Sequence, residues 1–198
     1  MASEAASNAS LSDQDLVCQV TAGNGDAFGM IVERHQDRLY NTVYRLVGSA
    51  EDARDVLQDV FLKAFENLDR FRGGSSLYTW LFRIAVNTSL SHRRKRRWVP
   101  MGLAAPDDAE NTGRPPLADP SPADPADPLM AAETERLIQE AISSLDDEHR
   151  TIVVLRDIQH CDYREIADIL DVPPGTVKSR LHRARLLLRD RLKPLLPC

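Results

Sequence analysis

Residues 162–185 read DYREIADILDVPPGTVKSRLHRAR, and this stretch decides the fold of the C-terminal half. Its first four residues have the spacing of a helix capping box, with Asp in place of Ser or Thr, so a short helix is expected to begin there. The run 171–175 ends that helix, and a second helix is expected from about 176 to 192. Two short helices joined by a tight turn, with the small Ala167 where they must approach, predict a helix-turn-helix.

The second helix of this motif is basic, with Val177, Leu181 and Leu188 as its apolar side. Arg and Lys read guanine O6 and N7 when such a helix enters the major groove of DNA. The residues expected to meet DNA are Lys178, Ser179, Arg180, His182, Arg183 and Arg185. Of these, Arg180 and Arg185 are better placed for phosphates or solvent than for bases. On spacing alone, an ordinary helical hairpin with a solvated basic face is the alternative.

Helical periodicity also dominates the N-terminal half, and no run alternates apolar and polar residues cleanly enough to indicate a strand. Helices are expected from about 12 to 22, from 26 to 47, from 51 to 68 and from 77 into a basic cluster at 93–97, with a loop at 71–76. The sequence therefore predicts an all-α fold.

Composition changes abruptly between the two halves. From 100 to 128 the chain is rich in Pro and Asp, and Arg114 is its only base. Such a stretch cannot bury enough apolar surface to offset the entropy of ordering it. We therefore expect two small helical domains joined by a flexible acidic linker. The expected boundaries are a disordered tail at 1–10, a first domain at 11–97, the linker at 98–131, a second domain at 132–193 and a tail at 194–198.

Several function classes lack support in the 198 residues. No apolar run is long enough to span a bilayer, and no secretory signal is visible at the N-terminus. The three cysteines are far apart and odd in number, which fits reduced thiols in a cytosol. The five histidines are dispersed, and no Gly-rich phosphate loop, metal cluster or nucleophile–base set occurs. We therefore expect no enzyme, catalytic residue, metal, cofactor or small-molecule substrate.

Five segments together resemble a known family. Residues 52–61 (DARDVLQDVF), 71–74 (FRGG) and 78–87 (YTWLFRIAVN) resemble region 2 of the extracytoplasmic-function (ECF) sigma factors. Residues 163–170 (YREIADIL) and 174–185 (PGTVKSRLHRAR) resemble region 4 of the same family. The resemblance covers nearly everything except the tails and the linker. It implies a region 2 helical bundle and a region 4 helix-turn-helix, in a protein that binds core RNA polymerase, directs it to −10 and −35 promoter elements and promotes DNA melting.

An acidic helix face is the first surface to which the resemblance assigns a role. Asp52, Asp55, Gln58 and Asp59 have spacings that place them on one side of a helix. Such a face is often only solvated. The resemblance implies that Asp55, Gln58 and Asp59 contact the clamp helices of the largest polymerase subunit, where carboxylates would form charge-assisted hydrogen bonds with arginines.

The resemblance assigns −10 reading to the loop at 71–76 and the helix that follows. Unpaired bases are stabilised by aromatic stacking and polar pockets, and phosphates by basic clusters. The residues expected to meet −10 DNA are Arg72, Ser75, Tyr78, Trp80, Asn87, Arg93 and Arg94. Trp80 is also a candidate for the core, because Leu77, Leu81 and Ile84 define a buried side. The resemblance likewise assigns the six donors of the last helix to the −35 element.

Partners follow from the same resemblance. They are core RNA polymerase, promoter DNA and an anti-sigma factor, commonly membrane-anchored, that could hold this bacterial cytoplasmic protein at the inner membrane face. The resemblance implies that the protein acts in a stress or envelope response under the control of this anti-sigma factor. The rival interpretation is a helix-turn-helix regulator that binds DNA without polymerase. It leaves unexplained the acidic face, the 71–76 loop and Asn87 taken together.

Overall fold

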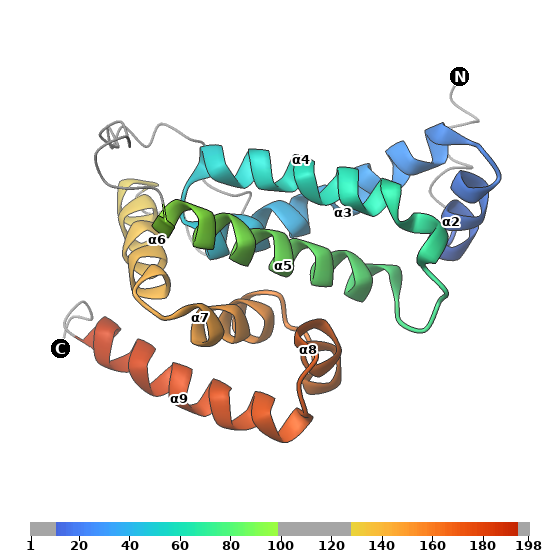
Figure 1. Cartoon of the computed structure of the whole chain (residues 1–198). Coiled ribbons are helices and arrows are strands. Elements are labelled where there is room, and N and C mark those ends of the chain that lie inside the picture. Colours follow the sequence, from blue (N-terminus) through green and yellow to red (C-terminus); the bar gives the residue numbers. More distant parts are fainter. Residues whose placement is uncertain (1–10, 99–127, 194–198) are drawn as a thin grey trace.

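The computed structural model describes residues 11–98 and 128–193, and every regular element in these two ranges is helical (Figure 1). The first range contains α2 (Asp13–Thr21), α3 (Gly25–Val47), α4 (Ala50–Glu66), the 3₁₀ turn η1 (Leu68–Arg70) and α5 (Leu77–Trp98). The second contains α6 (Pro128–Ser143), α7 (Asp147–Val153), the π-helical turn η2 (Val154–Ile158), α8 (Tyr163–Leu170) and α9 (Pro174–Leu192). The predicted all-α fold is confirmed.

Local capping explains where several helices begin and end. Ser12 and Asp162 each form a capping box, at the start of α2 and α8 respectively. Gly48 ends α3 with φ +85°, and Asp171 ends α8 in the left-handed region with φ 54°. Asp tolerates that conformation better than most residues because its short side chain bonds locally.

The helix boundaries differ from expectation in three places. The helix expected to reach 68 ends at Glu66, and Leu68 lies in the following 3₁₀ turn. Helix α5 extends to Trp98 and α6 begins at Pro128, so both enter the range 98–131 expected as linker. A proline fits there because the first turn of a helix does not need its missing N–H. Residues 99–127, and the expected tails at 1–10 and 194–198, lie outside the described ranges.

The first range forms a module in which α3, α4 and α5 pack together, with α2 across one end of α3. Its core is almost entirely aliphatic, with Phe82 as a fully buried aromatic. Its most buried members include Leu16, Ile31, Leu39, Val43, Leu46, Val60, Leu81 and Phe82. This core fixes the facing sides of α4 and α5.

The second range forms a module in which α7 and α8 pack against α9. Arg150 lies at its centre with only 1% of its surface exposed. Its guanidinium donates to the carbonyls of Ile142 (3.1 Å) and Leu145 (2.8 Å), and also to that of Ser143. These are carbonyls at the end of α6 and in the turn after it, which lack partners within the helix.

The two modules pack against one another along α5 and the C-terminal half of α3. Helices α7 and α8 lie between α5 and α9, so α9 is on the side away from the first module (Figure 1). Arg150 crosses the boundary by donating to the carbonyl of Leu46 at 3.0 Å. Buried apolar residues of both modules consequently form one continuous cluster.

Candidate nucleic-acid interface

The outer face of α4 combines carboxylates with exposed apolar side chains. Asp55, Gln58 and Asp59, the three residues expected to contact polymerase, are all exposed. Leu62 and Phe65 follow on the same face and are 54% and 52% exposed. The sequence did not indicate that these two side chains are exposed, because Leu and Phe at helical spacing usually lie in the core.

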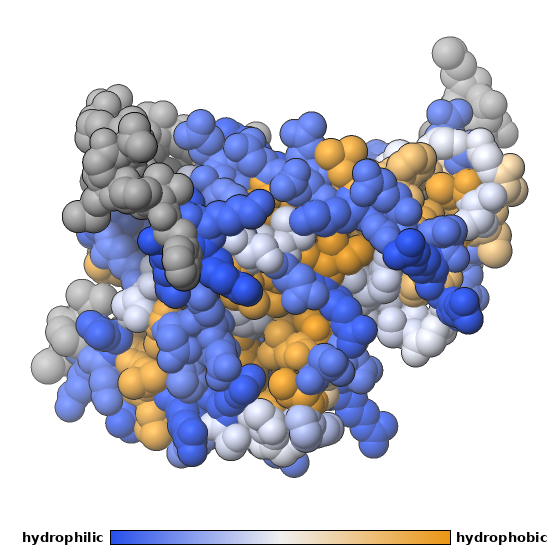
Figure 2. All heavy atoms as spheres, viewed as in Figure 1, coloured by the Kyte–Doolittle hydropathy of each residue, from blue (hydrophilic) through white to orange (hydrophobic). Residues whose placement is uncertain are grey.

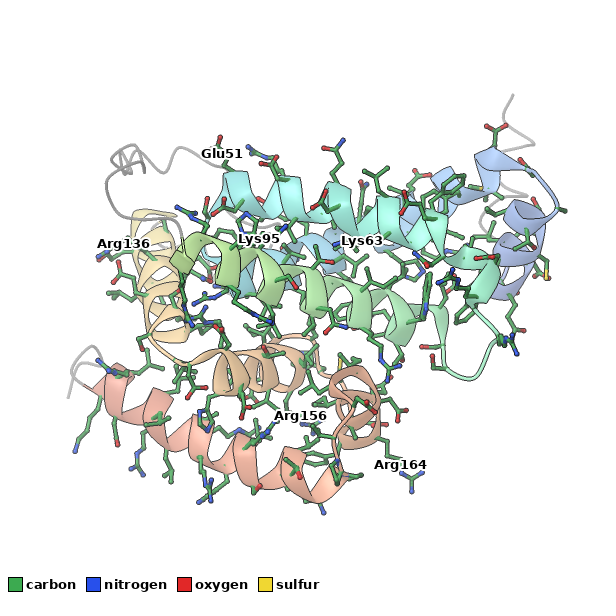
Figure 3. The ribbon with its side chains drawn as sticks, viewed as in Figure 1. Glu51, Lys63, Lys95, Arg136, Arg156 and Arg164 are labelled. Atoms are coloured by element: carbon green, nitrogen blue, oxygen red, sulfur yellow. The ribbon has the colours of Figure 1, made fainter. Side chains whose placement is uncertain are left out.

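Asp52, expected on the same acidic face, lies elsewhere. Its carboxylate pairs with Arg96 and lies 3.6 Å from His92 Nε2, both on α5. Asp52 thus belongs to the contact between α4 and α5, while Glu51 beside it points away from α5 (Figure 3).

A pocket of about 430 Å³ opens between α4 and α5. Figure 2 shows apolar residues along the line between these helices, bordered by hydrophilic ones. The lining residues are Lys63, Asn67, Arg70, Trp80, Ile84, Asn87, Thr88 and Ser91. Of the residues expected to read the −10 element, the structure brings Trp80 and Asn87 together here. The volume is in the range of ligand pockets, roughly 300–1,000 Å³.

Lys63 supplies a positive charge to this pocket from the opposite helix. It lies between α4 and α5 (Figure 3), and its Nζ donates to Thr88 Oγ1 at 3.1 Å. Thr88 itself is buried. Sequence reasoning missed Lys63, Asn67, Arg70, Thr88 and Ser91. The available signal was that Lys63 is the only base in the second half of α4.

The loop that precedes α5 lies at one end of the pocket. Phe71 packs against Trp80 with their ring centroids 5.5 Å apart. Both rings are partly buried and pack against the core, so Trp80 forms a wall of the pocket and a part of the core at once. Arg72 is exposed and Ser75 is half-buried, and neither lines the pocket.

Tyr78 and Arg93 lie on a different side of α5, against the second module. The Tyr78 hydroxyl is 3.8 Å from Cys161 Sγ, and the Arg38 guanidinium lies 4.3 Å from the Tyr78 ring centroid. Burial raises the pKa of the Tyr78 phenol and that of the Cys161 thiol. Arg93 Nε lies 3.0 Å from Asp147 Oδ1. The seven residues expected at the −10 element therefore do not form one site. Trp80 and Asn87 line the pocket, Arg72 and Ser75 lie in the loop, Tyr78 and Arg93 lie in the contact with the second module, and Arg94 is exposed.

Helix α9 carries the six residues expected at the −35 element. Five of them are exposed, and Arg180 is half-buried. His182 and Arg183 are exposed residues of α9. Helix α9 lies on the side away from the first module (Figure 1). Arg180 pairs with Glu148 at 3.2 Å, and Arg185 donates to both carboxylate oxygens of Asp157. That hydrogen bonding raises the pKa of Arg185. The surface outside the ion pairs is therefore formed by Lys178, Ser179, His182 and Arg183.

Across residues 11–98 and 128–193, no three His, Cys, Asp or Glu side chains are grouped closely enough to hold a metal ion. No helix in the same ranges is long and apolar enough to cross a membrane.

Sequence comparisons match residues 31–99 to the Sigma-70 region 2 family and residues 135–188 to the Sigma-70 region 4 family. The ECF RNA polymerase sigma-E factor of Haemophilus influenzae is 37% identical over 189 residues, which cover 94% of this chain and 98% of that protein. The chain belongs to the ECF sigma factors. The ECF sigma factor SigW of Bacillus subtilis is 38% identical over 185 residues, covering 89% of this chain and 95% of that protein.

Two solved structures show the same fold. CnrH, solved with the cytosolic domain of CnrY, matches with a TM-score of 0.68 at 26% identity over 92% of this chain and 97% of that one. The sigma factor RpoE of Bartonella quintana, solved with the anti-sigma factor NepR, matches with a TM-score of 0.63 at 26% identity over 84% and 96%. In this sigma factor, region 2 therefore contains the α4 face and the pocket, and region 4 contains α9.

Proposed function

We propose that this sigma factor captures an unpaired base of the −10 element in the pocket between α4 and α5. The observation that carries the proposal is the juxtaposition of Trp80, Asn87 and Lys63 around one cavity. Duplex opening without a fuel source requires that the separated bases be stabilised by the protein. Stacking on an aromatic ring contributes about 1–3 kcal/mol per base.

Each wall of the pocket has a chemical task in this proposal. Trp80 and Ile84 offer apolar surface for the flat face of a base. The Asn87 amide both donates and accepts hydrogen bonds, so it can read a base edge. Lys63, directed by its bond to Thr88, donates to an acceptor on that edge. Arg70 at the rim is suited to a phosphate.

The α4 face is the proposed contact with core polymerase. Its carboxylates Asp55 and Asp59 would pair with basic side chains of the partner, and Gln58 would add hydrogen bonds. Leu62 and Phe65 supply the apolar area that stable interfaces contain at their centre. An acidic surface that also exposes two large apolar side chains fits a protein partner better than solvent.

The α9 face is the proposed contact with the −35 element. Lys178, Ser179, His182 and Arg183 are exposed together on a helix that follows the turn of a helix-turn-helix. Such a helix inserts its N-terminal residues into the major groove. Arg185, held by Asp157, would position the helix on the DNA backbone.

We also propose that an anti-sigma factor controls this protein. Both structural relatives described above were solved with protein partners, one of them named an anti-sigma factor. The proposal includes a cytoplasmic location, a stress or envelope response, and the absence of any catalytic site, cofactor or small-molecule substrate.

The test is run-off transcription with core polymerase on a library of promoter sequences. The wild type should direct initiation and report both recognition elements. N87A should lower open-complex formation by about tenfold, since one lost base-reading contact corresponds to about 1–3 kcal/mol. N41A, which removes an Asn side chain from α3 outside the pocket, should behave as wild type. Retardation of duplex promoter DNA without core polymerase, together with no effect of polymerase, would instead favour a conventional regulator.

A further inference from the structure

One tyrosine ring connects the segment before the helix-turn-helix to the helix proposed to read DNA. Tyr163 is the first residue of α8. The guanidinium carbon of Arg156, from η2, lies 5.0 Å from the centroid of the Tyr163 ring, and Lys178 Nζ, from α9, lies 5.8 Å from the same centroid. Both distances fall within the roughly 6 Å at which the negative face of an aromatic ring attracts a cation. Two basic side chains of different elements are therefore joined through one ring.

Arg156 is held in place by a second contact. It is half-buried, and its Nη1 donates to the carbonyl of Cys161 at 2.7 Å. That carbonyl belongs to the turn between η2 and α8, where His160 has a left-handed backbone with φ 57°. In Figure 3, Arg156 lies between the α7–η2 segment and α9. The guanidinium consequently has little freedom to move away from the Tyr163 ring.

Lys178 is held differently from the arginines that follow it on α9. Arg180 and Arg185 pair with carboxylates of α7 and η2. A carboxylate offsets the charge of its partner, and DNA must compete with it for the guanidinium. For Lys178, the described part of the chain places no carboxylate within ion-pairing distance, and the contact found is the Tyr163 ring. The ring holds the ammonium without neutralising it, because the ring has no net charge.

The hydroxyl of Tyr163 is not needed for this arrangement. Within residues 11–98 and 128–193, it makes no hydrogen bond to a side chain or to the backbone. The ring is partly buried and packs against the hydrophobic core. Its position is therefore set by packing and by Arg156, and phenylalanine can replace it without loss of an internal bond.

We propose that Tyr163 is a positioning residue for −35 recognition, whose ring holds the Lys178 ammonium in the direction from which it meets one base pair. The inference rests on the proposed function, because it assumes that the exposed face of α9 reads the −35 element. A free lysine side chain loses rotamer freedom when it binds, and restricting it beforehand reduces that cost. A ring that restricts Lys178 affects discrimination at one base pair, whereas loss of folding weakens binding to every sequence.

The test measures promoter binding by the full chain with core polymerase. The DNA set changes each base pair of the −35 element in turn, starting from a promoter selected from the run-off library. The ratio of affinities for the original and the changed sequence is the discrimination at that position. K178A identifies the base pair that Lys178 reads. Y163L removes the ring, Y163F keeps it, and Y40L, which removes a partly buried tyrosine ring from α3, is the matched control.

A fluorinated ring separates electrostatic attraction from packing. Tyr163→pentafluorophenylalanine keeps nearly the shape of phenylalanine, so it packs as Y163F does, but its fluorine atoms withdraw the electron density that attracts a cation. This variant keeps the proposal testable if circular dichroism shows that Y163L does not fold.

We expect K178A to lower discrimination about tenfold at one base pair, as the loss of one base contact does. Y163L and the fluorinated variant should lower it about threefold at the same base pair, because a cation–ring contact at an exposed site is weaker than a base contact. The double variant Y163L/K178A should match K178A, since the ring then has no ammonium to hold. Y163F and Y40L should match the wild type.

Three results would overturn the inference alone. An equal loss for Y163F would assign the effect to the hydroxyl, and a uniform loss for Y163L across all base pairs would indicate a folding role. Normal discrimination in the fluorinated variant would exclude attraction by the ring. A flat K178A profile would instead show that Lys178 reads no base, and would overturn its proposed role on α9 together with the inference. Because the first three results leave the K178A profile intact, the two failures are told apart.

Discussion

Replacing Arg150 by Met tests how region 4 is held together. The Arg150 side chain is 1% exposed, and its guanidinium donates to four carbonyls, those of Leu46, Ile142, Ser143 and Leu145. Met keeps much of the side-chain volume but donates no hydrogen bond. The variant therefore leaves four carbonyls without their partner, and three of these belong to the end of α6 and the turn after it.

The magnitude follows from the kind of bond that is lost. Hydrogen bonds from a charged donor contribute about 1.5–3 kcal/mol each, but losses at one side chain are not additive. Because the substitution also removes a buried charge that is costly to desolvate, part of the loss is offset. We expect the free energy of unfolding to fall by about 3–5 kcal/mol, which is a large share of the roughly 5–15 kcal/mol of a typical protein.

Urea denaturation followed by circular dichroism measures this change. R189M is the matched control. The Arg189 side chain is 68% exposed, and it pairs with its neighbour Asp190. The control should change the free energy of unfolding by less than about 0.5 kcal/mol. A loss below about 1 kcal/mol for R150M would show that the four carbonyls find other partners, and would refute the reasoning.

Three further predictions concern other surfaces. D59R should weaken binding to core polymerase by at least about tenfold without changing the melting temperature of the protein. Competition for labelled polymerase measures the binding, and D37R, on the exposed side of α3, is the control variant. D171V should cost about 1–2 kcal/mol because a β-branched residue resists the left-handed conformation found there, while D171G should be nearly neutral in the same urea titration. At pH 8, Cys161 should be alkylated far more slowly than the exposed Cys18, because burial shields its thiol and raises its pKa; equal rates by mass spectrometry without denaturant would contradict this.

Much of the fold is determined by signals that act over a few residues. Asp162 and Glu165 lie three positions apart and cap α8 as their spacing indicates, and Asp171 ends the same helix as expected. Helices that depend on such local bonds can be placed from sequence alone. The first turn of α6 was missed because Pro128 ends a proline-rich run, although Pro is also common at a helix start.

The candidate site was only partly predictable because some of its lining residues come from α4 and the turn after it. Trp80, Ile84, Asn87 and Ser91 share one face of α5, so their proximity follows from helical spacing. Lys63 reaches the same pocket from α4, and the sequence does not say which side of α4 faces α5 at that point. The packing of region 4 on α5 had no local signal at all, because partners such as Arg45 and Glu135 are ninety positions apart.

Helix α9 lies on the outside of the packed molecule. Its proposed DNA-binding face is therefore more accessible to DNA than the residues of α5 that lie in the contact between the two regions. His182 and Arg183 of this helix are exposed while both regions remain in contact. Tyr78 and Arg93 are half-buried in the contact between the two regions, where they lie beside Cys161 and Asp147 respectively. Encounter with intact promoter DNA would then precede capture of the separated strand, and the order of events would be built into the shape of the free protein.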